Sequence, residues 1–284
     1  MQLSVIIVTH NSFHVIPRCL ELLREQLNQS FPSSKMYEIV VVDNASTDET
    51  VPFLKKQKNI ISVLLPENTG FGVGNNTGVA HSAGDFLLLL NSDVYLDHPI
   101  DFPVLLSFLA KEKRRAALAI RLNTPDGKMD KACHRGFPTP LNSFVYFSGL
   151  EKLMGGTYHL TDADLTTIHE IDCPSAAFFL MKRSVFTEVK GFDSDYFFYA
   201  EDIDLCYRIK KLGYSIWFYP SYQAQHLKYQ SGQKSVDSSA RVRSKSYFFS
   251  SMGMFYEKHY TTKYPLFITF FVRLGIKIMS VLKK

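Results

Sequence analysis

The stretch LLLLNSDV, residues 87–94, runs from four leucines directly into Asn91, Ser92 and the acidic Asp93. Such an apolar run is typical of a strand that is buried on both faces of a parallel sheet. A charged carboxylate at the end of a buried strand is costly unless something compensates it. Asp93 is therefore expected either to hold a ligand or to cap a turn, and turn capping is common for aspartate.

The same pattern occurs three times earlier, in LSVIIV, EIVVV and ISVLL, which begin at residues 3, 38 and 61. Between the first two strands a helix with one apolar face is predicted from Val15, Cys19, Leu20, Leu23 and Leu27. Strands that alternate with helices predict an open, doubly wound α/β sheet with right-handed crossovers. After a weakly patterned segment, residues 123–171, the chain predicts a strand from residue 176 and a helix over about residues 202–212.

Short, mostly polar clusters follow the first four strands. They are Thr9, His10 and Asn11; Asp43, Asn44 and Ala45; Asn68, Thr69 and Gly70; and Asn91, Ser92 and Asp93. Ligands of open α/β sheets bind beyond the carboxyl ends of the strands, so these clusters are expected to surround one site. For the first two clusters, strand termination and helix capping are equally reasonable roles.

The glycine-rich stretch GFGVGNNTG, residues 70–78, contains no GxGxxG register, and it follows the third strand instead of the first. Both features argue against a Rossmann dinucleotide site. Its small residues still allow a phosphate or a ribose to approach the start of a helix closely.

A second candidate for chemistry is YAEDIDLCYR, residues 199–208. The helix dipole favours Glu201 and Asp202 at a helix start, so simple capping is one interpretation. The other is that one of these carboxylates is a general base. The aromatic run before them, residues 196–199, suits either a platform for a sugar ring or the core. A lone histidine such as His226 is usually packed or on the surface, but near Asp93 it could complete a metal site.

The composition is that of an ordinary globular protein: 284 residues, 46% hydrophobic and 21% charged, enough for one large domain or two small ones. The four cysteines are scattered without a CxxC pair, so we expect them to be reduced and the protein to be cytosolic. The N-terminal segment MQLSVIIVTHNS lacks a basic n-region and is expected to be a strand and not an export signal.

The positive charge lies at the end of the chain. The net charge is +5, and residues 241–284 carry nine Lys or Arg against the single acid Glu257. This basic aromatic tail predicts a helix that lies on an anionic membrane surface, since spanning would bury Arg273 and Lys277 at about 2.5–3.5 kcal/mol each. Nucleic acid is not the expected partner, because Phe, Ile and Leu are interleaved with the charges. Packing on the rest of the chain, or on a second subunit in a homodimer, is the alternative.

Five motifs in this order resemble the family 2 glycosyltransferases of the nucleotide-diphospho-sugar transferase (GT-A) fold: SVIIVTHN, VVVDNASTD, ENTGFGVGNNTG, LLLLNSDV and GFDSDYFFYAEDIDLCYRIKKLGY. The branch they resemble most is the rhamnosyltransferase-like enzymes of bacterial polysaccharide assembly, over residues 3–260. The resemblance implies an α/β fold with a mixed, mostly parallel central sheet flanked by helices and a C-terminal helical tail. It implies a catalytic domain over residues 1–240, with a nucleotide-binding half to about residue 121 and an acceptor half from about residue 122, followed by the tail at residues 241–284.

The implied activity is an inverting, Mg2+- or Mn2+-assisted transfer of a sugar from a nucleotide-diphosphate sugar to a hydroxyl of a polysaccharide or lipid-linked glycan. Rhamnose from a thymidine donor is the favoured sugar, and the cytoplasmic side of the plasma membrane is the expected location. A non-catalytic nucleotide-sugar-binding protein of the same fold is the alternative function.

The resemblance also assigns residues. Asp202 would be the base, with Glu201 next in line, and Asp93 with His226 would hold the metal, His226 lying in an HxxxxS pattern that ends at Ser231. The donor would be bound by Thr9, Asn11, Asp43, Asn44, Asn68, Gly70, Asn75, Asn91, Ser92 and Asp93, and the acceptor by Asp193, Phe198 and Tyr199. One departure matters: Asn91 stands at the first acidic position of the metal motif. Metal affinity is then expected to be weaker, or to depend more on His226 and the phosphates.

Overall fold

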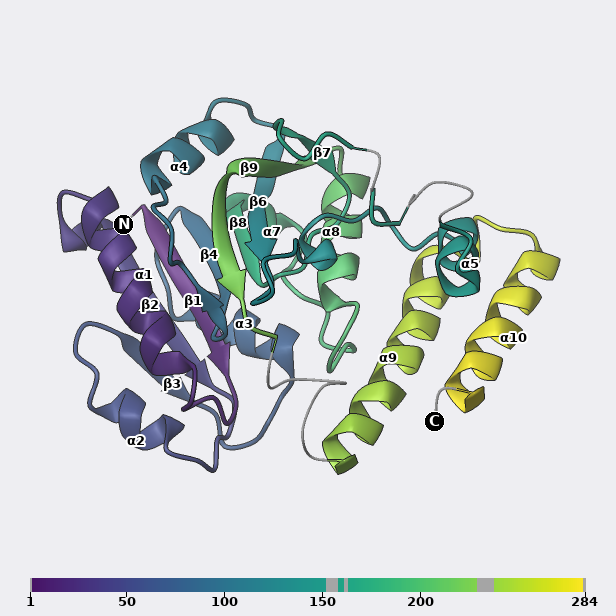
Figure 1. Cartoon of the computed structure of the whole chain (residues 1–284), viewed down its shortest axis with the longest axis horizontal. Coiled ribbons are helices and arrows are strands. Elements are labelled where there is room, and N and C mark those ends of the chain that lie inside the picture. Colours follow the sequence, from purple (N-terminus) through teal and green to yellow (C-terminus); the bar gives the residue numbers. More distant parts are fainter. Residues whose placement is uncertain (1, 152–157, 161–162, 229–237, 283–284) are drawn as a thin grey trace.

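The structure is a computed structural model that describes residues 2–151, 158–160, 163–228 and 238–282. Within these residues a nine-stranded sheet forms the centre of the molecule, in the order β3-β2-β1-β4-β8-β6-β9-β5, with β7 paired to β9 off this path (Figure 1). Cys19, Cys133, Cys173 and Cys206 are all buried and free, as predicted.

The first half of the sheet is parallel. Its strands are β1 (Leu3–Thr9), β2 (Tyr37–Asp43), β3 (Ile61–Leu64) and β4 (Phe86–Asn91). Thr9 pairs in register with Asp43, and Val8 with Asn91, so the polar residues that follow these strands lie at one edge. β1, β2 and β4 are buried on both faces, as their sequences predict. β3 is not, because it is the edge strand, and Ile61 and Leu64 are about two-fifths exposed.

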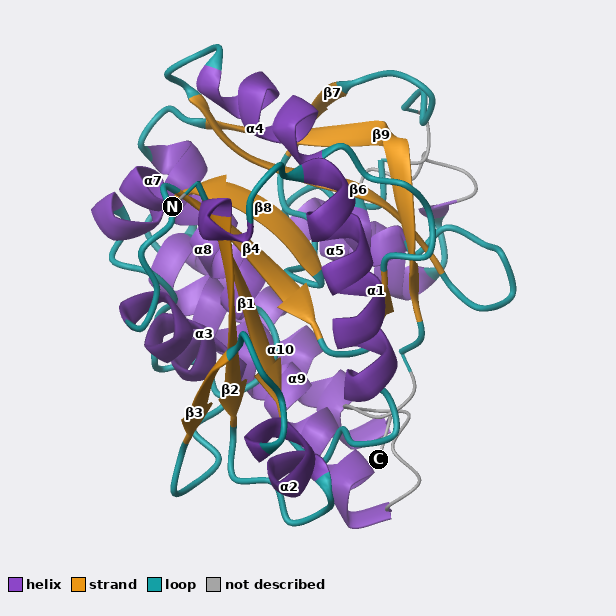
Figure 2. Cartoon of the chain, turned by 90° about the vertical axis from the view of Figure 1, so that its left-hand side faces the viewer, coloured by secondary structure: helices purple, strands orange, loops and turns teal. Residues whose placement is uncertain are grey.

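Helices cover both faces of the parallel strands. They are α1 (Ile16–Ser30), α2 (Thr50–Lys55) and α3 (Phe71–Ala80). Figure 2 shows the strands running between α1 on one side and α3 on the other. Two glycines of α3 explain how closely it packs: a Cβ at Gly74 would meet Val8 at 2.8 Å, and one at Gly78 would meet Ile6 at 2.4 Å. Both glycines belong to the glycine-rich stretch at residues 70–78, and their lack of a side chain allows α3 to pack closely on the sheet.

The second half of the sheet is mixed. Its strands are β5 (Val94–Tyr95), β6 (Arg115–Asn123), β7 (His169–Ile171), β8 (Phe178–Lys182) and β9 (Ser215–His226). β8 lies between β4 and β6 and is antiparallel to both, whereas β6 and β9 are parallel. The short strand β5 pairs antiparallel with β9, which places Val94 opposite His226. The sheet is thus mixed, as the family resemblance implied, and the doubly wound parallel pattern is confined to its first four strands.

The remaining helices are α4 (Phe102–Ala110), the 3-10 helices η1 (Ser34–Met36) and η2 (Lys131–Cys133), α5 (Pro140–Ser148), α7 (Arg183–Glu188), α8 (Glu201–Lys211), α9 (Ser238–His259) and α10 (Leu266–Leu282). α8 begins one residue before its predicted start. Tyr199 and Ala200 both have positive φ, 70° and 64°, so the backbone turns sharply just before the paired acids.

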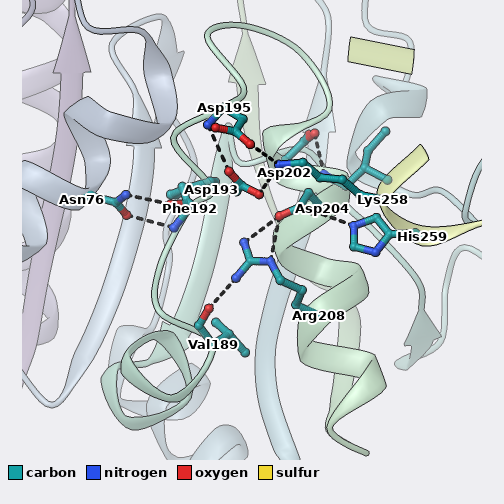
Figure 3. A network of polar contacts seen from close by, with 11 residues as sticks. Asn76, Val189, Phe192, Asp193, Asp195, Asp202, Asp204, Arg208, Lys258 and His259 are labelled. Atoms are coloured by element: carbon teal, nitrogen blue, oxygen red, sulfur yellow. Dashed lines mark hydrogen bonds and ion pairs between the residues drawn. The ribbon is translucent and has the colours of Figure 1, made fainter. Parts of the chain in front are cut away.

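Near the C-terminal end of α9, ionic contacts hold this helix against the sheet domain (Figure 3). Lys258 Nζ lies 2.6 Å from carboxylate oxygens of both Asp193 and Asp195. His259 Nε2 lies 2.7 Å from Asp204 Oδ1, and Asp204 is buried within α8. The domain boundary predicted at residue 240 falls near the start of this helix.

α10 packs along α9 at the end of the molecule farthest from β3 (Figure 1). Arg273 pairs with Glu257 at 2.8 Å, and the hydroxyls of Tyr256 and Thr269 are 3.0 Å apart. Much of α10 remains uncovered, since Leu266 is 87% exposed and Phe267 and Phe270 are each 62% exposed. A membrane-crossing helix, judged by length and apolar character, is not found in the described part of the chain.

Candidate active site

One cavity of about 1040 Å³ is lined by the residues predicted to be catalytic or to bind the metal. Its lining includes Asp93 from the β4–β5 turn, Glu201 and Asp202 from the start of α8, and His226 from the end of β9. These positions are remote in sequence. The fold therefore brings both acidic motifs and the late histidine to one place.

Asp93 and His226 meet because β5 pairs with β9. His226 Nε2 lies 3.4 Å from Asp93 Oδ1, while its Nδ1 lies 2.9 Å from Oδ2 of Asp130. Asp130 is buried, and Lys228 Nζ lies 2.5 Å from its other oxygen. Burial by itself would lower the pKa of His226, but the hydrogen bonds to Asp130 and Asp93 outweigh it and raise this pKa to about 9. The His226 ring is therefore mainly the imidazolium at neutral pH, and it lies between the carboxylates of Asp93 and Asp130.

The residues around His226 offer part of a site for a divalent cation. The described residues contain no group of three or more His, Cys, Asp or Glu side chains arranged to hold a metal. Asp93 and the Nε2 atom of His226 nevertheless form a donor pair, and Asp130 orients the imidazole from its other nitrogen, as is common for metal-binding histidines. Asn91 Oδ1 is buried without a hydrogen-bond partner among the described residues and lines the same cavity. This set fits a cation shared with the oxygens of a bound diphosphate.

Asp202 is paired with an arginine that the sequence did not single out. Arg135 donates from Nη2 to Asp202 Oδ2 at 2.7 Å and from Nε to the carbonyl of Cys173 at 3.1 Å. Asp202 Oδ1 also accepts the backbone N–H of Ile203 at 2.8 Å. Burial opposes the charged form of Arg135, yet the charge of Asp202 holds the pKa of the guanidinium well above its usual value. Both members of this ion pair line the cavity.

Glu201 lies in a different environment from its neighbour. It is buried, and its Oε2 atom has no hydrogen-bond partner among the described residues. Burial, together with the charge of Asp202, raises the pKa of Glu201 to about 8. At neutral pH Glu201 is mainly protonated, whereas Asp202 has a cationic partner.

Thr9 and Asp43 form a polar pair at the ends of β1 and β2. Both are buried, and Thr9 Oγ1 and Asp43 Oδ1 have no hydrogen-bond partner among the described residues. The other oxygen of Asp43 accepts the N–H of Ser46 at 2.9 Å. The pair lies outside the lining of the large cavity.

Other candidates for donor binding hold the loops together through backbone contacts. Asn11 Oδ1 accepts the N–H of Thr47 at 2.7 Å, Asn44 Oδ1 that of Thr69 at 2.8 Å, and Asn68 Oδ1 that of Gly70 at 3.0 Å. Asn75 donates to the carbonyl of Phe71 within α3 at 2.9 Å.

Gly70 and Ser92 are two donor-binding candidates that lie in closely packed surroundings. Gly70 has a φ of 85°, and a Cβ there would meet the Phe197 carbonyl at 2.4 Å, so the position requires glycine. Ser92 is buried, and neither residue lines the cavity.

The acceptor candidates separate into two groups. Phe198 and Tyr199 line the cavity, and the Tyr199 hydroxyl lies 2.8 Å from that of Ser244 in α9. Asp193 does not line it; its carboxylate binds Lys258 and accepts the N–H of Asp195 at 3.0 Å (Figure 3). Ser231, the last residue of the HxxxxS pattern, lies outside the described residues.

Sequence reasoning missed Arg135, Asp130 and Lys228. The first two fall in the weakly patterned segment, where neither spacing nor periodicity marks a residue as part of a site. Asp130 is buried and the Arg135 side chain is 11% exposed, and such low exposure of a charged residue is visible only after folding.

Comparison with known proteins places the chain among glycosyltransferases. A family model described as Glycosyl transferase family 2 matches residues 4–189. The chain is 26% identical over 254 residues to Rhamnosyltransferase WbbL of Escherichia coli (strain K12), covering 86% of this chain and 90% of that protein. It is 27% identical over 247 residues to the N-acetylglucosaminyl-diphospho-decaprenol L-rhamnosyltransferase of Mycobacterium tuberculosis, covering 80% of this chain and 76% of the relative.

Solved structures show the fold. Staphylococcus aureus TarS superposes with a TM-score of 0.57 at 20% identity, over 89% of this chain and 39% of the TarS chain. The mannosyltransferase PcManGT from Pyrobaculum calidifontis, solved with GDP-Man and Mn2+, superposes with a TM-score of 0.55 at 17% identity, over 90% of this chain and 63% of the other. The predicted GT-A fold is thereby confirmed.

Proposed function

Because the chain belongs to glycosyl transferase family 2, we propose that it transfers a sugar from a nucleotide-diphosphate sugar to a hydroxyl of a polysaccharide or lipid-linked glycan, with inversion at the anomeric carbon. Rhamnose is the sugar we propose, since two relatives that match over most of their length are named rhamnosyltransferases. The observation that carries the proposal is the convergence of Asp93, Asp202 and His226 on one cavity.

In this proposal Asp202 is the general base. A carboxylate offers about four lone-pair positions, and Arg135 and the N–H of Ile203 use two of them, which leaves acceptor capacity for the proton of an incoming hydroxyl. Arg135 pairs with the carboxylate and fixes its orientation. Glu201 is the weaker candidate, because its raised pKa leaves it mainly protonated at neutral pH.

Asp93 and His226, together with Asn91, which lines the same cavity, are the residues proposed to hold Mg2+ or Mn2+ with the donor diphosphate. When bound, such a cation stabilises the negative charge of the departing diphosphate. Asp130 accepts a hydrogen bond from Nδ1 of His226, which leaves Nε2 as the ligand atom once its proton is released.

Thr9 and Asp43 are proposed to bind the base of the donor nucleotide. The support is that each has a buried oxygen without a hydrogen-bond partner among the described residues, at adjacent strand ends. Buried polar atoms are seldom left without a partner, so a ligand that supplies N–H groups fits this position.

We further propose that α10 attaches the chain to an anionic membrane at the cytoplasmic face. The support is the exposure of Leu266, Phe267 and Phe270 on a helix of the basic tail. A homodimer that covers the same face is the competing arrangement.

The direct test of the transferase is turnover. Purified full-length chain is incubated with a panel of nucleotide-diphosphate sugars and Mg2+ or Mn2+, and release of the nucleoside diphosphate is measured with and without glycan acceptors. Metal-dependent release from one donor, rhamnose being favoured, is the expected result. Saturable donor binding without release or transfer by the wild-type chain would instead support the non-catalytic nucleotide-sugar-binding alternative.

A further inference from the structure

The cavity that holds the candidate carboxylates is also bounded by apolar helices. Its lining includes Leu141 and Phe144 of α5, Met252 of α9, and Val272, Ile276 and Met279 of α10. Figure 1 shows these three helices together at one end of the molecule. The cavity therefore joins an ionic region, formed by the β4–β5 turn, the start of α8 and the end of β9, to a region lined with hydrocarbon.

Core packing does not account for the apolar region. Side chains that belong to a core are covered, whereas Leu141 and Phe144 are each 62% exposed although both line the cavity. Phe271 of α10, another lining residue, is 64% exposed. Contiguous exposed apolar surface in a soluble protein usually marks a binding site.

The dimensions and chemistry of the cavity restrict its occupant. A volume of about 1040 Å³ is at the upper end of the roughly 300–1,000 Å³ of common ligand pockets. A polysaccharide is polar along its whole length and gains little from the aliphatic walls that Leu, Val, Ile and Met provide. A molecule that is polar at one end and hydrocarbon at the other matches both regions at once.

We infer that the apolar region binds the hydrocarbon chain of a lipid-linked acceptor, with α5, α9 and α10 as its walls. The inference rests on the proposed transfer to an acceptor hydroxyl, and it selects the lipid-linked acceptor over the free polysaccharide. It also gives α10 a second use: its inner side contributes to the site, and its outer side is the face proposed above to meet a membrane.

A photoreactive farnesyl diphosphate with a diazirine at the far end of its chain tests the inference on the full-length protein. Saturable adducts on α5, α9 or the inner side of α10, located by mass spectrometry, are the expected result. Unlabelled farnesyl diphosphate should suppress labelling at least tenfold, whereas inorganic diphosphate at the same concentration should change it less than twofold. Labelling that does not saturate, or that inorganic diphosphate suppresses equally, would overturn the inference.

Two isoleucines of α10 provide a matched pair of variants. Ile276 lines the cavity, whereas Ile278 is 47% exposed and does not. Each methylene buried by a ligand is worth about fourfold in affinity, so Ile276→Asn should raise the Kd for farnesyl diphosphate at least tenfold. Ile278→Asn should change it less than twofold. Circular dichroism and the Tm of both variants establish that the fold is retained.

The pattern of failure distinguishes the alternatives. If Ile278→Asn weakens binding as much as Ile276→Asn, the chain is held on the outer face of α10, and the inference is wrong. Photolabelling needs no turnover. Sugar transfer to a soluble glycan without saturable labelling would therefore reject the inference alone, and saturable labelling without turnover of any donor would reject the proposed function instead.

Discussion

The Nε2 atom of His226 lies 3.4 Å from Oδ1 of Asp93, and this contact exists because Val94 and His226 are partners in the antiparallel β5–β9 pair. A two-residue strand thus fixes the relation between the candidate metal ligands. Asp130 binds the opposite nitrogen of the ring, so the imidazole is held from both sides. The first prediction concerns this outer carboxylate.

Asp130→Asn should weaken Mn2+ binding in the presence of a nucleoside diphosphate by about 10- to 100-fold, because removing the partner of a metal-binding histidine typically has that effect. The measurement is a calorimetric titration at constant nucleotide concentration. Asp126→Asn is the control, because Asp126 lies on the surface in the preceding turn, where it pairs with Lys128 and Thr124. Equal Mn2+ affinities in the two variants would show that Asp130 does not contribute to metal binding.

Asp202→Asn should lower the rate of transfer by about 10²- to 10⁴-fold, the usual contribution of a general base, while the donor Kd changes less than twofold. Glu201→Gln should cost far less, because glutamine resembles the protonated acid present at neutral pH. Single-turnover kinetics with saturating donor separate the two variants. The opposite ranking would make Glu201 the base.

The Arg135–Asp202 ion pair should be important for stability as well as for catalysis. Its members have side-chain exposures of 11% and 14%, and removing one partner of such a pair leaves a buried charge. Arg135→Met should therefore lower the free energy of unfolding by about 3–5 kcal/mol in urea denaturation. The double variant Arg135→Met, Asp202→Leu should recover much of this loss. If the double variant is as unstable as the single one, the ion pair is not the cause.

Glu201 predicts a pH dependence of stability. Its folded-state pKa of about 8 lies above the ordinary 4.5, so the folded chain binds this proton more tightly than the unfolded chain does. The resulting stabilisation is fully present below pH 4.5 and is lost as the pH rises to 8, at up to about 1.4 kcal/mol per pH unit. Relative to wild type, Glu201→Gln should therefore become progressively more stable between pH 5 and pH 8 in urea denaturation. A constant difference over that range would contradict the assignment.

The exposed face of α10 should bind anionic vesicles. Leu266→Glu with Phe270→Glu should reduce flotation with vesicles of phosphatidylglycerol and phosphatidylcholine by about tenfold or more, because two apolar anchors are lost and two negative charges are added. Leu212→Glu is the control, since Leu212 is 52% exposed at the end of α8. If wild-type chain does not float but sediments as a dimer, and the double variant is monomeric, the face is a subunit interface.

The sequence alone determined the parallel half of the fold. Runs such as LSVIIV and LLLLN indicate that the segment itself is buried, and the polar residues that follow them mark the carboxyl ends of strands. The structure has β1, β2, β4 and α1 where this pattern predicts them. The family motifs added the identity of the candidate acids. The apolar runs and the polar residues that end them are local features, because hydrophobic periodicity is set by the immediate environment of each residue.

Tertiary structure decided which charges meet. The antiparallel insertion of β8 between β4 and β6, and the pairing of β5 with β9, depend on contacts between distant segments. The same is true of Asp130 beside His226 and Arg135 beside Asp202, which no spacing in the sequence connects. Glu201 and Asp202 are adjacent and chemically alike, yet burial leaves one mainly protonated while an arginine pairs with the other. The reason is that desolvation and Coulomb interactions depend on the three-dimensional surroundings of a group, and these are fixed only when the chain folds.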